Sequence, residues 1–514
     1  MKTVPHAAII LISAAFAADA MGGEWHVAPG NAAADDGNPG TAERPFRTVT
    51  AALGKAQAGD TVFLGDGDYP AQRIAGAFAP ALTLAAAPQA RPRLRGALDL
   101  SGASGIRVRG IAISWPAEGS VGNMTPFLQL AGARDIEISD SEIGDGADRT
   151  EWRGMAANIS RARDIALRNI RIRNVYFGVN VEFSERVTLE RLDIRLWTHE
   201  DGIRVRECPG PVLIEGCYLT NAGVAGRKGG HVDAIQVVYG SDNLTIRNCH
   251  IHGVAQAIGA FTDSRAAPDQ RRRRNWRIEG NLIYDVYTPH HATVVGADGV
   301  VVVNNTFPQG AARLSRCTGV VVKNNIFGEP AGTIEGLTEA GHNLWLAGAA
   351  KLAPTDIAGA DARFVNVETA LYRMDWGKRA ECTETRLYPR GAAGRLKVGD
   401  RIEVFTSDGS GRDGTLREIT AVDGDAIDIA PPLSAKPGSL GAIVYVWPPG
   451  HENRRPDYRL RPDSPAIDSA DGDVERGKDL AGNEPFDVPE APNTGAGRMP
   501  FLDRGALEYV PAPR

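Results

Sequence analysis

The amino-acid sequence predicts an all-β protein in which short parallel strands stack in successive turns of one long coil. Apolar and polar residues alternate in short runs, and most runs begin 20–32 residues apart, which is a solenoid period. The runs are β-branched and of period two, so they do not fit helices. The chain also has 59 glycines and only 6% aromatic residues, which is typical of many turns between short strands.

These runs occupy the middle of the chain. A second short strand follows most of them after a turn, as at residues 111–113 and 170–172. We therefore expect parallel sheets that extend along the coil. The runs lie at residues 106–108, 136–138, 165–167, 187–189, 212–214, 243–246, 300–302 and 320–322.

Residues 1–20 have the pattern of a secretory signal peptide. Lys2 precedes an apolar run from Ala7 to Ala18, and Ala18-Asp19-Ala20 fits an A-x-A cleavage site. The run is too short to cross a bilayer, and no later segment is long enough. We expect a secreted or periplasmic protein without a membrane span.

The segment 24–70 carries a recognisable lead-in. It reads Glu24-Trp25-His26-Val27, then Pro45-Phe46-Arg47-Thr48, a helix expected at about 48–57, and Gly59-Asp60-Thr61. This lead-in resembles the start of secreted right-handed parallel β-helix proteins of the pectate-lyase-like superfamily, a group that includes polysaccharide lyases. The resemblance implies that the helix caps the open end of the coil.

Aligned turns predict one interior column of side chains. Its last members, Asn281, Asn305 and Asn325, resemble the asparagine ladder of β-helices, in which amides satisfy turn backbone groups. Cys217 and Cys249 would stack in adjacent turns, either as a disulfide or as small buried residues. Five cysteines leave at least one free thiol, and without a C-x-x-C spacing we expect no structural zinc. The column also includes Ile111, Ser141, Ile170 and Leu192.

Three regions are expected after the signal peptide. Residues 21–375 would form the right-handed parallel β-helix with its N-terminal capping helix. Residues 394–447 alternate between hairpin signals and predict a small antiparallel β insert. Residues 448–514 resemble the closing segment of secreted β-helix proteins and would pack back on the coil. The resemblance is specific for the fold but not for the reaction.

One short sequence motif occurs twice, 32 residues apart. His199-Glu200-Asp201-Gly202-Ile203-Arg204-Val205 is followed by His231-Val232-Asp233-Ala234-Ile235-Gln236-Val237. If the aliphatic residues face the core, Arg204 and Gln236 point outward beside Asn180, and the two aspartates stack at the strand entrances. The pair His290-His291 falls near the same face.

The first hypothesis for this face is a lyase or epimerase acting on an acidic, uronate-containing polysaccharide. Arg204, Lys228 or a bound cation would neutralise the substrate carboxylate, and a histidine, lysine or arginine would take the C5 proton. The candidate catalytic residues are His199, Asp201, Arg204, Lys228, His231, Asp233, His290 and His291. The candidate substrate-binding residues are Asn180, Glu200, Gln236, Tyr239, Arg271 and Arg272.

Two other hypotheses stay open. Asp201 and Asp233 on adjacent turns could be the acid/base pair of a glycoside hydrolase. Alternatively, they only cap turns in a non-catalytic binding or surface protein. Ca²⁺ could be held by Glu200, Asp201 and Asp233, or a transition metal by His199, His231 and Asp233. The net charge of −6 argues against nucleic-acid binding, and we expect a monomer.

Overall fold

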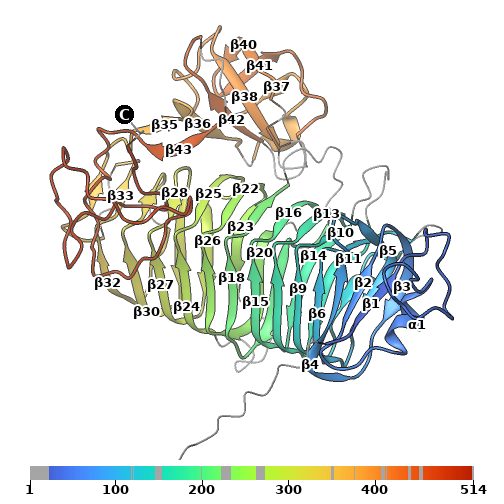
Figure 1. Ribbon diagram of the computed structural model, residues 1–514. Coiled ribbons are helices and arrows are strands. Elements are labelled where there is room, and N and C mark those ends of the chain that lie inside the picture. The colour runs from blue at the N-terminus through green and yellow to red at the C-terminus, as the bar shows by residue number, and fades with distance from the viewer. Residues whose placement is uncertain are drawn as a thin grey trace, which may run out of the picture.

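The computed structural model describes residues 22–511 except 117–118, 120, 145–152, 198, 222–232, 262–272, 331, 349–351, 376, 407–410, 413, 438–441 and 451–454. The described chain forms one long coil of parallel strands with an antiparallel domain standing on its side (Figure 1). This confirms the predicted parallel β-helix and antiparallel sheet. No helix in this part of the chain is long and apolar enough to span a membrane.

The strands of the coil stack into three parallel faces. The first face comprises β1 (Glu24–Val27), β2 (Thr61–Leu64), β4 (Ala77–Ala86), β6 (Ser104–Arg109), β9 (Arg134–Ser139), β12 (Arg163–Arg168), β15 (Glu185–Glu190), β18 (Val212–Glu215), β21 (Leu244–Arg247), β24 (Arg273–Glu279), β27 (Asp298–Val303), β30 (Thr318–Lys323) and β32 (Leu337–Gly341). The second face comprises β3 (Gly67–Arg73), β5 (Pro92–Asp99), β7 (Ala112–Ser114), β10 (Glu142–Gly144), β13 (Arg171–Val175), β16 (Asp193–Trp197), β19 (Tyr218–Thr220), β22 (His250–Val254), β25 (Leu282–Val286), β28 (Thr306–Phe307), β31 (Ile326–Phe327), β33 (Leu344–Trp345) and β34 (Ile357–Ala358). The third face comprises β8 (Pro126–Gln129), β11 (Met155–Ser160), β14 (Phe177–Glu182), β17 (Ile203–Cys208), β20 (Asp233–Asp242), β23 (Gln256–Ala260), β26 (His290–Val295) and β29 (Ala311–Ser315).

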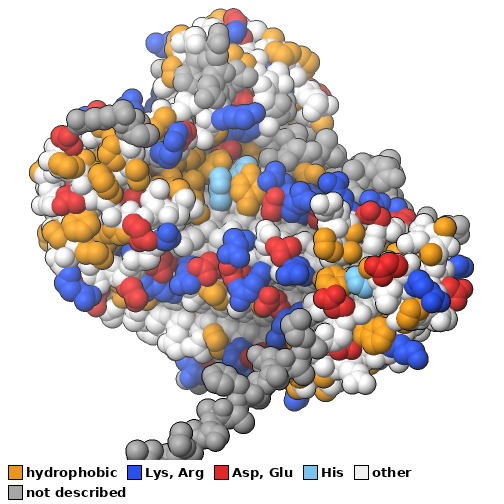
Figure 2. Space-filling model, viewed as in Figure 1, with side chains coloured by type: hydrophobic (Ala, Val, Ile, Leu, Met, Phe, Trp, Pro, Cys, Tyr) orange, Lys and Arg blue, Asp and Glu red, His pale blue; other side chains and the backbone are white. Residues whose placement is uncertain are grey.

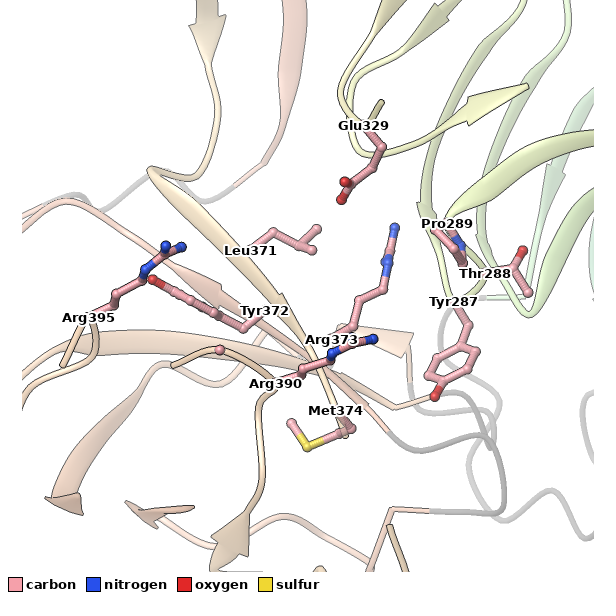
Figure 3. A pocket seen from close by; sticks show the side chains of 11 residues that line it. Tyr287, Thr288, Pro289, Glu329, Leu371, Tyr372, Arg373, Met374, Arg390 and Arg395 are labelled. Carbon is pink, nitrogen blue, oxygen red and sulfur yellow. The ribbon is translucent and has the colours of Figure 1, made fainter. Parts of the chain in front are cut away.

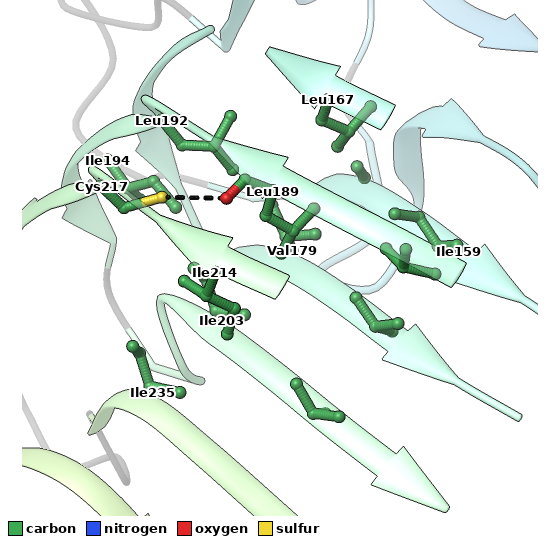
Figure 4. Packing of buried hydrophobic residues seen from close by; sticks show 14 of the residues in the cluster. Ile159, Leu167, Val179, Leu189, Leu192, Ile194, Ile203, Ile214, Cys217 and Ile235 are labelled. Carbon is green, nitrogen blue, oxygen red and sulfur yellow. Dashed lines mark hydrogen bonds between the residues drawn. The ribbon is translucent and has the colours of Figure 1, made fainter. Parts of the chain in front are cut away.

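Alternate side chains of each strand fill the interior of the coil. On the third face Val179, Ile203, Ile235 and Ile258 are paired from strand to strand, and all are buried. Figure 4 shows several of these residues packed against aliphatic side chains from the other two faces. Because side chains alternate between the two sides of a strand, this register fixes which polar residues point outward.

The N-terminal end of the coil is covered by a short helix, α1 (Val49–Leu53), which buries Val49 and Ala52. The Thr48 hydroxyl accepts a hydrogen bond from the Ala51 amide at 3.2 Å and caps the helix. The helix begins where the sequence predicts but ends at Leu53, several residues earlier than the expected end near residue 57.

The predicted interior asparagine ladder is present and is longer than expected. Asn281, Asn305 and Asn325 are buried, and each amide oxygen accepts from the backbone N–H of the residue one turn before it. Asn343 and Asp356 continue the ladder. Cys217 and Cys249 lie buried in the same column. Both are free thiols, so they are small buried residues and do not form a disulfide.

Replacing Asn305 with Ala is expected to lower the free energy of unfolding by about 2–4 kcal/mol. The amide of Asn305 bonds the Asn281 amide and the carbonyls of Ile278 and Val303, and unsatisfied buried groups cost about 1–3 kcal/mol each. Urea unfolding followed by circular dichroism measures the change. Thr318→Ala, at an exposed position on the same coil, serves as the control, and an equal effect of both substitutions would contradict the prediction.

The antiparallel domain has the sheet order β36-β42-β38-β40-β41-β37, with β39 paired to β38. It rises above the second face of the coil (Figure 1), and β39 contacts β22. Its sheet includes two strands that precede residue 394. The strands are β36 (Ala370–Arg373), β37 (Arg386–Leu387), β38 (Arg401–Thr406), β39 (Gly411–Arg412), β40 (Arg417–Asp423), β41 (Ala426–Ala430) and β42 (Ala442–Val446), with a 3-10 turn at Arg379–Glu381.

The C-terminal segment lies against the far end of the coil. A two-stranded sheet of β35 (Phe364–Asn366) and β43 (Asp457–Leu460) leads into it. The buried Arg504 then donates to the Asn343 carbonyl, and Gly505 donates to that of Asn324. These contacts close the apolar end of the solenoid.

Candidate functional site

The described parts of the repeated motif, from Asp201 and from Asp233 onward, lie on adjacent turns with the predicted register. Ile203 pairs with Ile235, and Arg204 with Gln236, at the start of β17 and β20. The Gly202 amide donates to the Asp233 carbonyl at 2.9 Å. Asp201 and Asp233 therefore stack at the strand entrances, but both side chains are 0% exposed.

Arg204 is engaged by its own neighbours. Its guanidinium pairs with Asp201 at 2.7 Å and with Glu200, and it lies 4.7 Å above the ring centroid of Phe177. Burial acts to lower the pKa of Arg204, but the two carboxylates raise it overall. The net charge of this trio is negative, which does not favour an acidic polymer at this point.

The other predicted residues divide among different environments. Asn180 points outward and donates to Asn158, and the Asp233 carboxylate accepts from Gln236 at 3.4 Å. His199 stacks on Tyr176 with ring centroids 4.7 Å apart. Tyr239 lies under the guanidinium of Arg206 at 4.9 Å.

The two remaining histidines lie two turns beyond Asp233, at the start of β26. His291, predicted as a catalytic residue near this face, lies inside the coil with 0% exposure. The register shift between His290 and Ala292 inserts an extra residue at this point, and His291 packs near Phe307. His290 is half-buried, and burial lowers its pKa.

Four predicted residues, Lys228, His231, Arg271 and Arg272, lie outside the described residues. Within the described ranges, no three His, Cys, Asp or Glu side chains are grouped so that they could hold a metal ion. The transition-metal hypothesis also needs His231. Both metal hypotheses stay predictions.

A second polar cluster, which was not among the predicted site residues, lies on the outer side of the second face. We call it the tyrosine–histidine cluster; it comprises Tyr218, His250, His252 and Tyr284 from β19, β22 and β25. The Tyr218 hydroxyl lies 2.6 Å from Nε2 of His252, and that of Tyr284 lies 3.2 Å from Nε2 of His250. The rings of His252 and Tyr284 are stacked at 4.9 Å and 6°. Both tyrosines and histidines thus form a continuous network.

Burial determines the protonation of this network. It lowers the pKa of His250 to about 3 and that of His252 to about 4, with Arg412 and Arg195 adding to the shift at His252. It also raises the pKa of Tyr218. At neutral pH the imidazoles are therefore uncharged and the phenol is protonated, so Tyr218 donates its hydrogen bond to His252.

Basic side chains adjoin this cluster. Arg195 lies over the ring of Tyr218 at 4.5 Å, and Arg173 lies one turn earlier. Both guanidinium groups share the carboxylate of Asp193, so this trio has a net charge of +1. Figure 2 shows histidine side chains beside basic side chains on this surface, beneath the antiparallel domain. A negatively charged sugar is better matched here than at Arg204.

The sequence contained a usable signal for this cluster. The spacing is the same 32 residues that separate the two copies of the repeated motif. It separates Tyr218 from His250, which pair on adjacent strands, and also His252 from Tyr284. Polar outward residues at the same position of successive turns form a ladder.

Comparisons with known proteins support the fold. Residues 100–271 match the right-handed β-helix region family, and residues 32–78 match a protein family of unknown function, DUF1565. The parallel strands and this match together indicate that the coil is a right-handed parallel β-helix. No curated protein matches the sequence.

Solved structures with a similar coil differ in what they do. Pectate lyase Pel9A is 11% identical, with 95% of this chain and 96% of that chain covered and a TM-score of 0.43. Alginate lyase from Paenibacillus sp. is 14% identical over 57% and 95% of the two chains, with a TM-score of 0.36. PfbA, a surface adhesin of Streptococcus pneumoniae, is 8% identical over 52% and 78%, with a TM-score of 0.32.

Proposed function

We propose that this protein is a secreted lyase that cleaves an acidic, uronate-containing polysaccharide by β-elimination at the tyrosine–histidine cluster. The observation that carries the proposal is the 2.6 Å contact between the Tyr218 hydroxyl and an uncharged His252, beside Arg195. The signal-peptide pattern of residues 1–20 supports secretion.

In this mechanism Arg195 and Arg173 bind the C6 carboxylate of a uronate residue and make its C5 proton more acidic. The Tyr218 oxygen takes that proton while its own proton moves to Nε2 of His252. The C4–O4 bond breaks, and a C4–C5 double bond forms. Tyr218 then donates a proton to the leaving oxygen, and His252 returns its proton to Tyr218. The pair ends in its starting state.

Incubation with pectate, alginate and glycosaminoglycans is expected to raise the ultraviolet absorbance that unsaturated uronates produce. An epimerase would exchange the C5 proton with solvent without that absorbance. If no polymer of the panel shows either signal, the proposal is wrong and a binding function takes its place.

A glycoside hydrolase is the second candidate, because Asp201 and Asp233 stack on adjacent turns. Release of reducing ends without ultraviolet absorbance would select it. In that case Asp233→Asn should abolish the release, whereas Tyr218→Phe should leave it unchanged. The reverse pattern supports the lyase.

A further inference from the structure

A cavity of about 710 Å³ lies between the coil and the antiparallel domain, apart from the tyrosine–histidine cluster. Tyr287 and Pro289 line it from the corner after β25, and Glu329 lines it from the segment after β31. Strand β36 and the turn that holds Arg390 and Arg395 form the opposite wall. Its volume is within the range of about 300–1,000 Å³ that is usual for small-molecule sites.

The cavity is strongly basic. Arg373, Arg390 and Arg395 line it, and Glu329 is the one acidic residue among the described residues of its lining. Figure 3 shows the Arg373 side chain extending from the antiparallel domain toward Glu329 and the coil. Among the described residues, Arg390 and Arg395 form no ion pair. The cavity therefore has an excess of positive charge that a bound anion would balance.

Arg373 is held in place by neutral groups. Its guanidinium donates to the carbonyls of Gln309 at 2.6 Å and Val286 at 3.4 Å, and its buried Nε has no partner among the described residues. Burial lowers the pKa of Arg373 and raises that of Glu329. A fixed, desolvated guanidinium that forms no ion pair within the described part of the chain is suited to charge-assisted hydrogen bonds with a ligand.

The remaining walls suit a sugar ring. Tyr287 and Tyr372 offer aromatic faces, and Leu371 and Met374 add apolar surface.

We infer that this cavity binds a carboxylate-bearing sugar, namely one uronate residue of an oligosaccharide. The choice of sugar rests on the proposed function, whereas the anionic character follows from the three arginines. Bound there, an oligosaccharide is held by a second point besides the tyrosine–histidine cluster.

Isothermal titration with galacturonate, guluronate and glucuronate trisaccharides tests the inference. The full chain carrying Tyr218→Phe is used, so that turnover does not consume the ligand. Adding Arg390→Gln and Arg395→Gln together is expected to weaken binding of the best ligand about a hundredfold or more, because two charge-assisted hydrogen bonds to the ligand carboxylate are lost. Arg401→Gln, an exposed and ion-paired arginine of the same domain, is the control.

The inference is overturned if the double variant binds as tightly as its parent, if no uronate trisaccharide binds, or if maltotriose binds equally well. These outcomes are separate from the absorbance assay. A chain that binds uronates through Arg390 and Arg395 but never generates absorbance would retain this site and lose the proposed lyase activity.

Discussion

His252→Gln and Tyr218→Phe are each expected to reduce kcat on the responsive polymer by about 10²–10⁴-fold, the usual contribution of a proton-transferring side chain. Glutamine cannot accept a proton at neutral pH, and phenylalanine removes the hydroxyl that lies 2.6 Å from the imidazole. Because the two residues act as one unit, the double variant should be little worse than either single variant.

The matched control is His199→Gln. His199 is another histidine stacked on a tyrosine, Tyr176, but it lies at the entrance of β17 among the residues that the sequence analysis favoured. It should leave kcat nearly unchanged. If His199→Gln removes activity and His252→Gln does not, the catalytic site lies at the entrances of β17 and β20, and the tyrosine–histidine cluster is not catalytic.

The pH dependence of kcat gives an independent test of the same pair. His252 must be neutral to accept the proton, and burial lowers its pKa to about 4. Its neutral form therefore predominates above that pH, and kcat should fall as the pH drops through about 4. An acidic limb near 6.5, the ordinary value for histidine, would contradict a buried base.

The repetitive part of the fold could be predicted because its determinants are local. Ile203 and Ile235 alternate with outward polar residues, and one register accounts for both turns. The asparagine ladder was predicted as far as Asn325 but not to Asn343 and Asp356, because the adjoining strands β33 and β34 have only two residues each.

The candidate site was harder to predict because it depends on features without periodicity. His291 is buried at a register shift in β26, and no pattern in the sequence predicts that shift. Arg412 lies 160 positions after His252 in the chain, yet it lowers the pKa of that histidine. Contacts between separate domains are set by packing, which hydrophobic periodicity does not reveal.

Arg412 is also the centre of a buried charged cluster that joins the antiparallel domain to the coil. Its side chain is only 9% exposed and pairs with Asp285 of β25 at 2.6 Å. Glu368 and Glu403 lie 3.5 and 3.6 Å from the same guanidinium, which stacks 3.5 Å from the ring centroid of Tyr445. The Arg412 guanidinium is thus the shared ion-pair partner of three buried carboxylates.

Arg412→Met is therefore expected to lower the free energy of unfolding by about 3–5 kcal/mol, because it leaves carboxylates buried without their cation. Arg401→Met is the control, since its exposed pair with Glu418 contributes about 0–1 kcal/mol. Urea unfolding measures both. Similar losses in the two variants would mean that the buried cluster does not hold the domains together.

The loss should depend on pH in a defined direction. Burial already raises the pKa of Glu368, and Arg412 opposes that rise, so removing the arginine raises this pKa further. A carboxyl whose pKa is higher in the folded chain binds more protons there than in the unfolded chain, and stability then increases as the pH falls. Arg412→Met should consequently be less destabilising at pH 5 than at pH 8. A loss that is equal at both values would mean that the variant is destabilised by lost packing on Tyr445 rather than by uncompensated charge.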